Sequence, residues 1–341
     1  MNEPLNSLAQ KMIPAVEREM EDVSGLEIKA RDPFYGLMHY HMGWVDKSFD
    51  PAASISGKRI RPLLSMLCAS SAGGSWEQAV PGAASIELLH NFTLIHDDIQ
   101  DASPIRRGRP TLWQIWGANL AINSGDAMFA LAHIVMSRLI ERDVSPEVVV
   151  QAIRRLDETC IDLTIGQHAD MTFEERADVS VDEYLAMING KTAALLAFST
   201  ELGGLVAGCD ENIVDHFAAF GRDLGMAFQV RDDILGIWGE ESLIGKSAAT
   251  DIVTRKKSLP VLFGLSKSNT LQQLYASDDS GQEFVERVVG ILDEIGAREF
   301  CERYEEDYAR NALSHLKASQ ASGEAATALQ QLTGTLLNRQ A

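Results

Sequence analysis

The sequence predicts an all-α protein, and three observations support this prediction. Apolar residues recur with the 3.6-residue period of amphipathic helices in long segments of the 341-residue chain. Gly, Pro and Asp/Ser clusters separate these segments at the points where helices would begin and end. Alternating apolar and polar runs, the signal of strands, are almost absent. Because no Pro/Gly/Ser-rich linker divides the chain, we expect a single domain over residues 1–341.

The expected helices can be placed along the chain from these signals. Residues 1–50 should form one or two helices with a break near Asp32 and Pro33. A helix that starts near Ala83 should end at Ser103 and Pro104, because proline cannot continue a helix. Further helices are expected at 63–69, 117–140, 147–171, 184–205 and 212–238, another starts at 258–260, and amphipathic helices fill 266–341.

Composition and charge exclude several classes of protein. The formal net charge of −19 argues against a nucleic-acid surface, because affinity for a phosphate backbone comes mainly from Lys and Arg. The four cysteines are far apart and lack a CxxC pattern, so neither a zinc site nor a disulfide framework is indicated. The N-terminus lacks the apolar core of a signal peptide, and Asp126 and Glu201 interrupt the longest apolar runs. We therefore expect no membrane span and a cytoplasmic location.

Three carboxylates stand at the end of the helix that starts near Ala83. Asp97 and Asp101 are four residues apart and share one helix face, with Asp98 beside them. Carboxylates at this spacing repel one another unless a cation lies between them, and oxygen ligands favour a hard ion such as Mg²⁺, completed by substrate phosphates. The alternative is a solvated acidic helix end. If this motif stood alone, the two interpretations would be equally well supported.

The residues around these aspartates favour a metal-diphosphate site. After the break at Ser103 and Pro104, the turn should present Arg106 and Arg107 near the carboxylates, where guanidinium groups can bind phosphate oxygens bidentately. His90 lies seven residues before Asp97, within about 20° of it on the same helix. A single histidine on such a helix is more often a packed core residue, so it supports the site only together with the others.

Two basic segments elsewhere are unusual for their positions. Lys58 and Arg61 are three residues apart at a helix start, where the helix dipole favours anions, so a bound anion would resolve the conflict. Lys191 and Thr192 lie in the apolar middle of the helix expected at 184–205. A buried lysine needs an anionic partner, although it can also extend to the surface. Each segment alone is as well explained by an exposed basic group.

A second aspartate pair lies on the helix expected at 212–238. Gln229 precedes Asp232 by three residues and Asp233 by four, so all three side chains can face one space. Two such acidic motifs on two long apolar helices predict carboxylates that face each other across a cavity.

Taken as an ordered set, these residues resemble the trans-isoprenyl diphosphate synthases. The set consists of GKRIRP from Gly57, HNFTLIHDDIQD from His90, RRGRPT from Arg106, GQHAD from Gly166, GKT from Gly190, FQVRDD from Phe228 and a GK…D…RKKS segment from Gly245. One motif would be weak evidence, but the family's order and approximate spacing are kept between residues 57 and 260. The resemblance implies an isoprenoid synthase fold, a single large helical bundle around a central cavity, usually in a homodimer.

The resemblance also implies a role for each matching position. The first aspartate motif, Asp97, Asp98 and Asp101, would hold two Mg²⁺ ions against the allylic diphosphate, and Asp232 with Asp233 would hold a third. The isopentenyl diphosphate site would consist of Lys58, Arg61, His90 and Arg107. The allylic diphosphate site would consist of Arg106, Lys191, Thr192, Gln229, Lys246 and Lys256. Of these, Arg106, Lys191, Thr192 and Gln229 would be the catalytic positions. The family's second motif usually ends in aspartate, whereas this chain has Gly236, so the third ion would bind more weakly.

The implied reaction needs no protein nucleophile. Departure of diphosphate develops negative charge on oxygen, which metal ions and fixed Arg and Lys donors stabilise. Product length depends on side chains before the first motif, here Phe92, Thr93 and Leu89. An aromatic residue five positions before the motif, followed by a small one, is similar to archaeal-type geranylgeranyl (C20) synthases, so we expect a C20 product.

Three alternatives remain open from the sequence. A farnesyl (C15) synthase would differ only in cavity depth. A class I terpene cyclase shares the first motif, but it would not need the isopentenyl site and would normally carry an Asn/Ser/Glu metal triad. A non-catalytic partner subunit should have lost the aspartate ligands, whereas here only one of six is missing.

Overall fold

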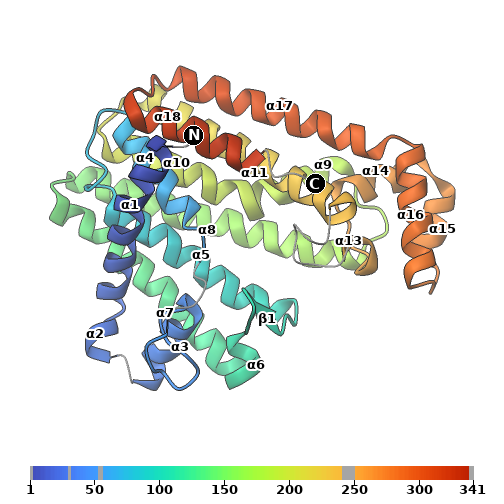
Figure 1. The fold of residues 1–341 in the computed structure, drawn as a ribbon, viewed down its shortest axis with the longest axis horizontal. Helices are drawn as coiled ribbons and strands as arrows, with labels where there is room; N and C mark the ends of the chain where they lie inside the picture. The colour runs from blue at the N-terminus through green and yellow to red at the C-terminus, as the bar shows by residue number, and fades with distance from the viewer. Residues whose placement is uncertain (1–2, 30–31, 53–56, 240–249, 338–341) are drawn as a thin grey trace. The chain divides into compact units, whose positions relative to one another are not determined.

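The structure is a computed structural model that describes residues 3–29, 32–52, 57–239 and 250–337. Figure 1 shows the helices along the chain, and contacts group the chain into two compact units. Unit 1 comprises residues 1–158, 198–215 and 320–329, and unit 2 comprises 159–197, 216–319 and 330–341. The prediction of an all-α fold is confirmed. The prediction of one domain over residues 1–341 stays a prediction.

Unit 1 contains the first aspartate motif. Its elements are α1 (Glu3–Val23), α2 (Leu26–Lys29), α3 (Pro33–Met42), α4 (Ile60–Ser71), α5 (Val80–Gln100), β1 (Ile105–Arg106), β2 (Arg109–Pro110), α6 (Leu112–Trp116), α7 (Ala118–Ser137) and the 3₁₀ helix η1 (Arg138–Arg142). The helix break predicted near Asp32 is confirmed, because α3 begins at Pro33 with the Asp32 side chain accepting a hydrogen bond from the Phe34 amide. Helix α5 packs along α7 and also against α1 and α4.

Helix α5 ends one residue before Asp101, which is its C-cap. The chain then forms a two-residue hairpin, in which β1 pairs with β2 and Arg106 lies opposite Arg109. Arg107 and Gly108 at the turn both have positive φ, the conformation that two-residue hairpins require. Arg109 anchors the hairpin to α3, since its guanidinium donates to the carbonyl oxygen of Tyr40 at 3.1 Å and lies over the Tyr40 ring. The hairpin therefore places Arg106 and Arg107 beside the end of α5.

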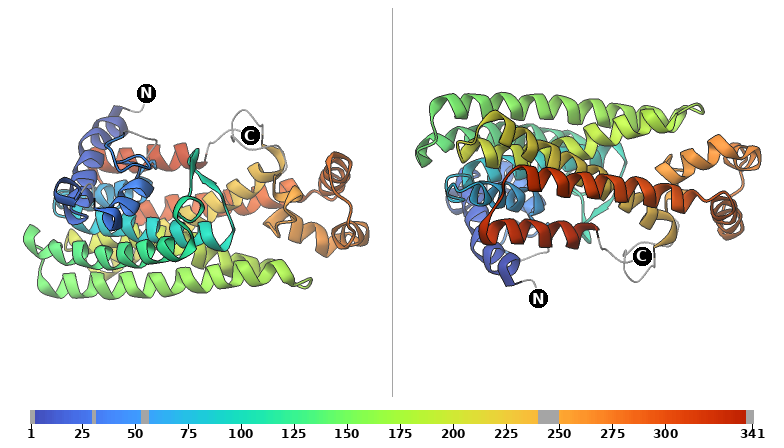
Figure 2. Two further views of the ribbon diagram at one scale, coloured as in Figure 1. Left: turned by 90° about the horizontal axis from the view of Figure 1, so that it is seen from below. Right: turned by 90° about the horizontal axis from the view of Figure 1, so that it is seen from above.

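Unit 2 contains the second aspartate motif. Its elements are α9 (Val181–Ile188), the π-helix η2 (Asn189–Ala193), α13 (Thr250–Val253), α14 (Leu259–Lys267), α15 (Asn269–Ala276), α16 (Gln282–Glu294) and α17 (Ala297–Ala318). Helices α15 and α16 pack against each other, and α14 and α17 pack against α16 (Figure 2). Four helices contain residues of both units: α8 (Pro146–Glu175), α10 (Ala194–Val206), α11 (Glu211–Trp238) and α18 (Gly323–Leu337).

The π-helix η2 is a difference from the sequence prediction. One continuous helix was expected over residues 184–205, whereas Asn189–Ala193 form a single wider turn between α9 and α10. Such turns insert a residue into a helix and occur frequently at functional sites. Lys191 and Thr192 both lie in this turn.

One apolar helical stretch needs comment because the sequence predicted no membrane span. Among the described helices, Ala118–Arg142 is long and apolar enough to cross a membrane by length and composition, with 39% of its most apolar window buried. Core helices of soluble proteins satisfy the same two criteria. Because α7, which makes up most of this stretch, packs along α5, its composition alone is weak evidence for a span.

Candidate active site

Arg106 is paired directly with the first aspartate motif. Its Nε atom donates to Asp98 Oδ1 at 2.6 Å, and its Nη2 atom donates to Asp97 Oδ2 at 3.4 Å. The predicted proximity of the hairpin to the carboxylates is therefore present within unit 1. Asp101 is exposed, and its amide donates to the Asp97 carbonyl oxygen at 2.9 Å, which continues the helix geometry to this residue.

The carboxyl group of Asp98 is the most unusual member of the motif. It is 2% exposed, and its Oδ2 atom has no hydrogen-bond partner among the described residues. Burial raises the pKa of Asp98 to about 6, although Arg106 opposes the shift. A buried carboxylate oxygen without a donor is costly and is well suited to a cation.

The same carboxylates are not yet arranged as a closed metal site. In the described part of the chain, no three His, Cys, Asp or Glu side chains are close enough together to hold a metal ion. At the first motif, the Arg106 guanidinium pairs with both Asp97 and Asp98. The donor chemistry fits Mg²⁺, provided that Arg106 turns to a substrate phosphate instead.

A basic cluster lies farther back along α5 in unit 1. The Nη1 atom of Arg61 donates to His90 Nε2 at 3.2 Å, so these two predicted residues are in contact. Burial, together with the charges of Arg61 and Arg107, holds the pKa of His90 well below its usual range. His90 is therefore neutral and accepts the hydrogen bond. The Nε atom of Arg61 is buried without an acceptor in the described residues, which suits an anion.

Gly57 leaves room for Arg107 beside this cluster. A Cβ atom at Gly57 would lie 2.8 Å from Arg107 Nη2, so glycine permits the close approach. Lys58, the next residue, is exposed. Its neighbour Arg59 has a different task, since it is buried in ion pairs of 2.6 Å with Glu17 and with Glu87. Arg59 therefore stabilises the fold, unlike Lys58 and Arg61, the other basic residues at the start of α4.

The sequence reasoning missed His41. This residue of α3 lines a small pocket in unit 1 with Asp98, Arg106 and Arg107. Burial and the charges of the two arginines lower the pKa of His41 to about 3, so it is neutral, and its Nε2 atom has no partner among the described residues. No spacing signal connects position 41 with the motifs.

Three of the predicted allylic residues of unit 2 make side-chain contacts in two separate sets. Lys191 Nζ donates to Asp170 Oδ2, so the anionic partner that a lysine in an apolar segment requires is Asp170 of the GQHAD segment. The Thr192 hydroxyl donates to Gln229 Oε1 at 2.9 Å, and Gln229 Nε2 donates to Asp233 Oδ1 at 3.1 Å. The first contact joins α8 to η2, and the second set joins η2 to α11.

Asp233 is placed differently from Asp232. Asp233 is 1% exposed, and its Oδ2 atom accepts from the Tyr184 hydroxyl at 2.5 Å and from the Leu259 amide at 3.1 Å. Burial raises its pKa to about 6. Because both of its oxygens already bind the protein, Asp233 is suited to orienting Gln229 and Tyr184. Asp232 is only half-buried, and the metal role of both aspartates stays a prediction.

Gly236 makes room for a third carboxylate. A Cβ atom at Gly236 would lie 2.6 Å from Asp251 Oδ2, so the Asp251 side chain from α13 occupies the space beside this glycine. The helix turn after Asp232 therefore has a carboxylate next to it, although it comes from another element. An aspartate at position 236 could be accommodated only if Asp251 moved.

Three glycines allow α8, η2 and α11 to approach one another closely. A Cβ atom would lie 2.3 Å from the Lys191 amide nitrogen at Gly166, 2.7 Å from the Asp162 carbonyl oxygen at Gly190, and 2.7 Å from the Ala193 Cα at Gly225. Each contact is with backbone, which cannot move aside as a flexible side chain does. The position of Lys191 therefore depends on these glycines.

The other predicted residues include two lysines of the allylic site and three residues assigned to product length. Lys246 lies outside the described residues, and Lys256 is exposed near Asp233, whose pKa its charge lowers. Leu89 is fully buried in α5. Thr93 donates to the His90 carbonyl oxygen at 2.7 Å. Phe92 packs edge-on against His96, with ring centroids 4.8 Å apart, and against Phe129 of α7 at 5.2 Å.

Comparison with known proteins gives matches along most of the chain. A family model described as polyprenyl synthetase matches residues 42–292. The chain is 41% identical to a (2E,6E)-farnesyl diphosphate synthase of Mycobacterium tuberculosis over 82% of this chain and 76% of the relative. It is 38% identical to a geranylgeranyl diphosphate synthase of the same species over 89% and 85%. The crystal structure of a polyprenyl synthetase from Streptomyces coelicolor has a TM-score of 0.86 and 32% identity, covering 98% of both chains.

Proposed function

The chain belongs to the polyprenyl synthetase family, and from this premise we propose that it joins isopentenyl diphosphate to an allylic diphosphate and releases geranylgeranyl diphosphate. Short-chain trans-prenyl transfer is the activity that the relatives share. The allylic substrate would be dimethylallyl, geranyl or farnesyl diphosphate, joined head to tail through a 1′-4 bond. The resemblance of the sequence to the trans-isoprenyl diphosphate synthases is thereby confirmed.

The observation that carries this proposal is the basic cluster of unit 1. Arg61, held by neutral His90 and accompanied by Arg107, offers buried donors to an anion that a terpene cyclase would not need. Unit 2 supplies Lys191, Thr192, Gln229 and Lys256 for a second diphosphate. Two sets of anion-binding residues match a reaction with two diphosphate substrates.

Mg²⁺ is the cofactor proposed for this site, with three ions expected when diphosphate is bound. Asp97, Asp98 and Asp101 would hold two ions, and Asp232, aided by the neighbouring Asp233 and Asp251, would hold the third. When bound, Mg²⁺ neutralises the charge that develops on the leaving diphosphate. The buried, unpartnered Oδ2 atom of Asp98 supports this assignment.

The residues of the chain would act on the substrates without forming a covalent bond to them. The C1–O bond of the allylic diphosphate breaks, and Arg106 and Lys191 stabilise the departing oxygens. The double bond of isopentenyl diphosphate then attacks C1 through its C4 atom. A proton leaves C2 of the isopentenyl unit for the released diphosphate, which restores a double bond. Apolar walls must exclude water, because water would capture the allylic cation.

The function is tested by incubating the protein with Mg²⁺, isopentenyl diphosphate and each allylic diphosphate in turn, then measuring products by chromatography. Elongation to a C20 diphosphate supports the proposal. A C15 product would identify a farnesyl synthase, cyclic hydrocarbons a terpene cyclase, and no turnover a non-catalytic subunit.

Phe92→Ala is expected to lengthen the product beyond C20. The Phe92 ring packs on Phe129 at 5.2 Å, and its removal opens space of roughly the size of an aromatic side chain beside α5. The product distribution of Phe92→Ala should be compared with that of Phe263→Ala, which changes a ring of unit 2 stacked on Phe300. Unchanged chain length in Phe92→Ala would contradict a role for Phe92 in the floor.

A homodimer is also proposed, and the surface of α7 supports it. Leu120 and Ile134 lie within about 40° of each other around α7 and are 47% and 53% exposed, which is unusual for such large apolar side chains. A second copy of the chain that covers this face would remove them from water. Sedimentation equilibrium should give twice the mass of 37.3 kDa.

A further inference from the structure

Three consecutive basic residues, Arg255, Lys256 and Lys257, precede helix α14 in unit 2. Their side chains have different environments. Arg255 and Lys257 both donate to backbone carbonyl oxygens at the ends of other helices, whereas Lys256 between them is exposed. Of the three residues, the sequence indicated only Lys256 as a substrate ligand. The two flanking residues therefore need an explanation of their own.

Lys257 binds the C-terminal end of α8. Its Nζ atom donates to the carbonyl oxygens of Phe173 and Arg176 and, at 3.2 Å, to that of Glu174. An ammonium group has three donors, and all three are used here. The last carbonyl groups of a helix lack partners within the helix and favour a positive charge, so this contact suits a lysine.

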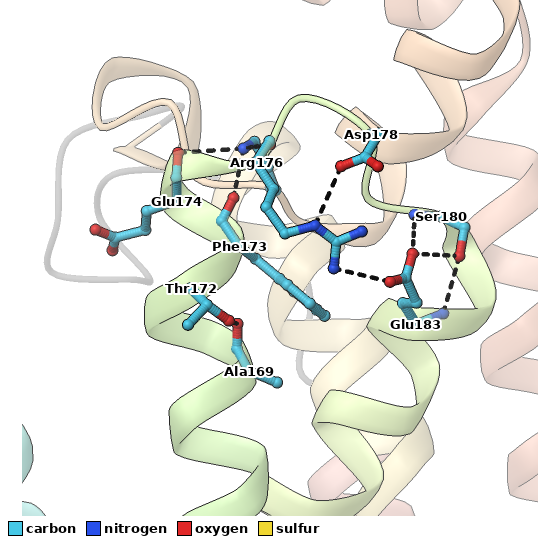
Figure 3. Close-up of polar contacts among 9 residues, drawn as sticks. Ala169, Thr172, Phe173, Glu174, Arg176, Asp178, Ser180 and Glu183 are labelled. Atoms are coloured by element: carbon cyan, nitrogen blue, oxygen red, sulfur yellow. Dashed lines mark hydrogen bonds and ion pairs between the residues drawn. The ribbon is translucent and has the colours of Figure 1, made fainter.

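The turn that Lys257 binds is itself fixed to α9. Arg176 pairs with Asp178 at 3.1 Å and with Glu183 at 2.8 Å (Figure 3). Glu183 and Ser180 form a capping box at the start of α9, in which the Glu183 side chain accepts from the Ser180 amide. Helix α9 carries Tyr184 and leads directly into the π-helix with Lys191. Lys257 is thus attached to the element that positions the predicted diphosphate ligands.

Arg255 makes the corresponding contact on the other side. Its guanidinium donates to the carbonyl oxygens of Tyr275 and Asp279, both at 2.6 Å, and so binds the end of α15. Arg255 has a φ of 54°, which a residue other than glycine adopts only where its surroundings compensate the strain. Arg255 lies in the turn after α13, where its amide donates to the Ile252 carbonyl oxygen at 3.0 Å.

The backbone around Lys256 makes two further hydrogen bonds, one of which reaches Asp233 of the second motif. The Lys256 amide donates to the Asp251 carbonyl oxygen at 2.8 Å, and the Leu259 amide donates to Asp233 Oδ2 at 3.1 Å. Lys256 lies close enough to Asp233 for its charge to lower the pKa of that carboxyl group. The segment 255–259 is therefore held at four points.

We propose that Lys257 and Arg255 are positioning residues that hold the Lys256 ammonium at the allylic diphosphate. The inference rests on the proposed function, because it assumes that Lys256 binds this substrate. Neither Lys257 nor Arg255 touches substrate; each acts through the backbone of residue 256.

The test compares two Michaelis constants in Lys257→Met, with the exposed Lys317→Met of α17 as the matched control. Loss of a well-placed charge-assisted hydrogen bond to phosphate should raise KM for geranyl diphosphate by about tenfold or more. The KM for isopentenyl diphosphate should remain unchanged, since its predicted ligands lie in unit 1. General destabilisation would not separate the two constants. Lys257→Arg, which retains a cation, should recover part of the loss.

Arg255→Gln provides a second route if Lys257→Met does not fold, and it should give the same separation of the two constants. An unchanged KM for geranyl diphosphate, or an equal rise for both substrates, would overturn the inference. Binding of geranyl diphosphate alone, measured by calorimetry without isopentenyl diphosphate, tests the positioning role separately from the proposed function. If the wild-type chain binds but does not condense, the proposed function fails, while weaker binding by Lys257→Met still supports the positioning role.

Discussion

Asp98→Asn is expected to lower kcat/KM by about a thousandfold, which corresponds to roughly 4 kcal/mol of transition-state stabilisation. The asparagine keeps the shape of the side chain but removes a charge that the first aspartate motif would offer to Mg²⁺. A loss of this size is reasonable because the metal ions counter the charge on the leaving diphosphate. Activity should be measured over a range of Mg²⁺ concentrations, since weaker metal binding would also raise the concentration needed for half-maximal rate.

The same substitution should leave the stability of the protein intact or raise it. Burial raises the pKa of Asp98 to about 6 from an ordinary 3.8, so the folded protein holds this proton more tightly than the unfolded chain. The protonated Asp98 side chain therefore stabilises the folded protein below the ordinary pKa of an aspartate. This contribution is lost as pH rises through about 6. At about pH 7.5 without Mg²⁺, Asp98→Asn should melt no lower than wild type, because the costly buried charge is gone.

Asp126→Asn is the control, because Asp126 on α7 is 65% exposed and lies 3.6 Å from His96. Both its activity and its melting temperature should stay near those of wild type. Retention of activity by Asp98→Asn to within a few-fold would contradict the metal site, whatever happened to its stability.

Local spacing along the sequence predicted several contacts within the candidate site, but not how deeply its side chains are buried. The helix that ends at the aspartates, the break that follows and the contact of Arg61 with His90 all depend on local spacing, which periodicity reports. Periodicity gives the angle of a side chain around its own helix but says nothing about depth. Asp232 and Asp233 are neighbours in the sequence, yet only Asp233 is fully buried and bound to Tyr184.

Long-range contacts explain what the sequence could not indicate. His41 joins the basic cluster through packing of α3, for which no motif exists. The π-helix lies inside an apolar helical segment, in which periodicity does not reveal one extra residue in a turn. A run of Arg and Lys such as residues 255–257 usually indicates a solvated surface. Only the structure shows that Arg255 and Lys257 bind backbone carbonyl groups while Lys256 is exposed.

Gly166→Ala is expected to impair both folding and activity, because the added methyl group has no space. Its Cβ atom would lie 2.3 Å from the Lys191 amide nitrogen and 2.9 Å from the Lys191 Cα. A helix-interior alanine is intrinsically more favourable than glycine by roughly 1 kcal/mol, so any destabilisation must come from this collision. Overpacking of a core costs about 1–3 kcal/mol, and here the obstacle is backbone. The expected result is a lower midpoint of chemical denaturation.

The effect on function should be specific, because the collision displaces the turn that carries Lys191 and Thr192. We expect KM for the allylic diphosphate to rise by about tenfold to a hundredfold, the size expected when a charge-assisted hydrogen bond is lost. Gly290→Ala is the matched control, since Gly290 lies in α16 of the same unit and a Cβ atom there would meet no heavy atom within 4 Å. That variant should be slightly more stable than wild type and fully active. If Gly166→Ala behaved like Gly290→Ala, the close approach of α8 to the π-helix would not position Lys191.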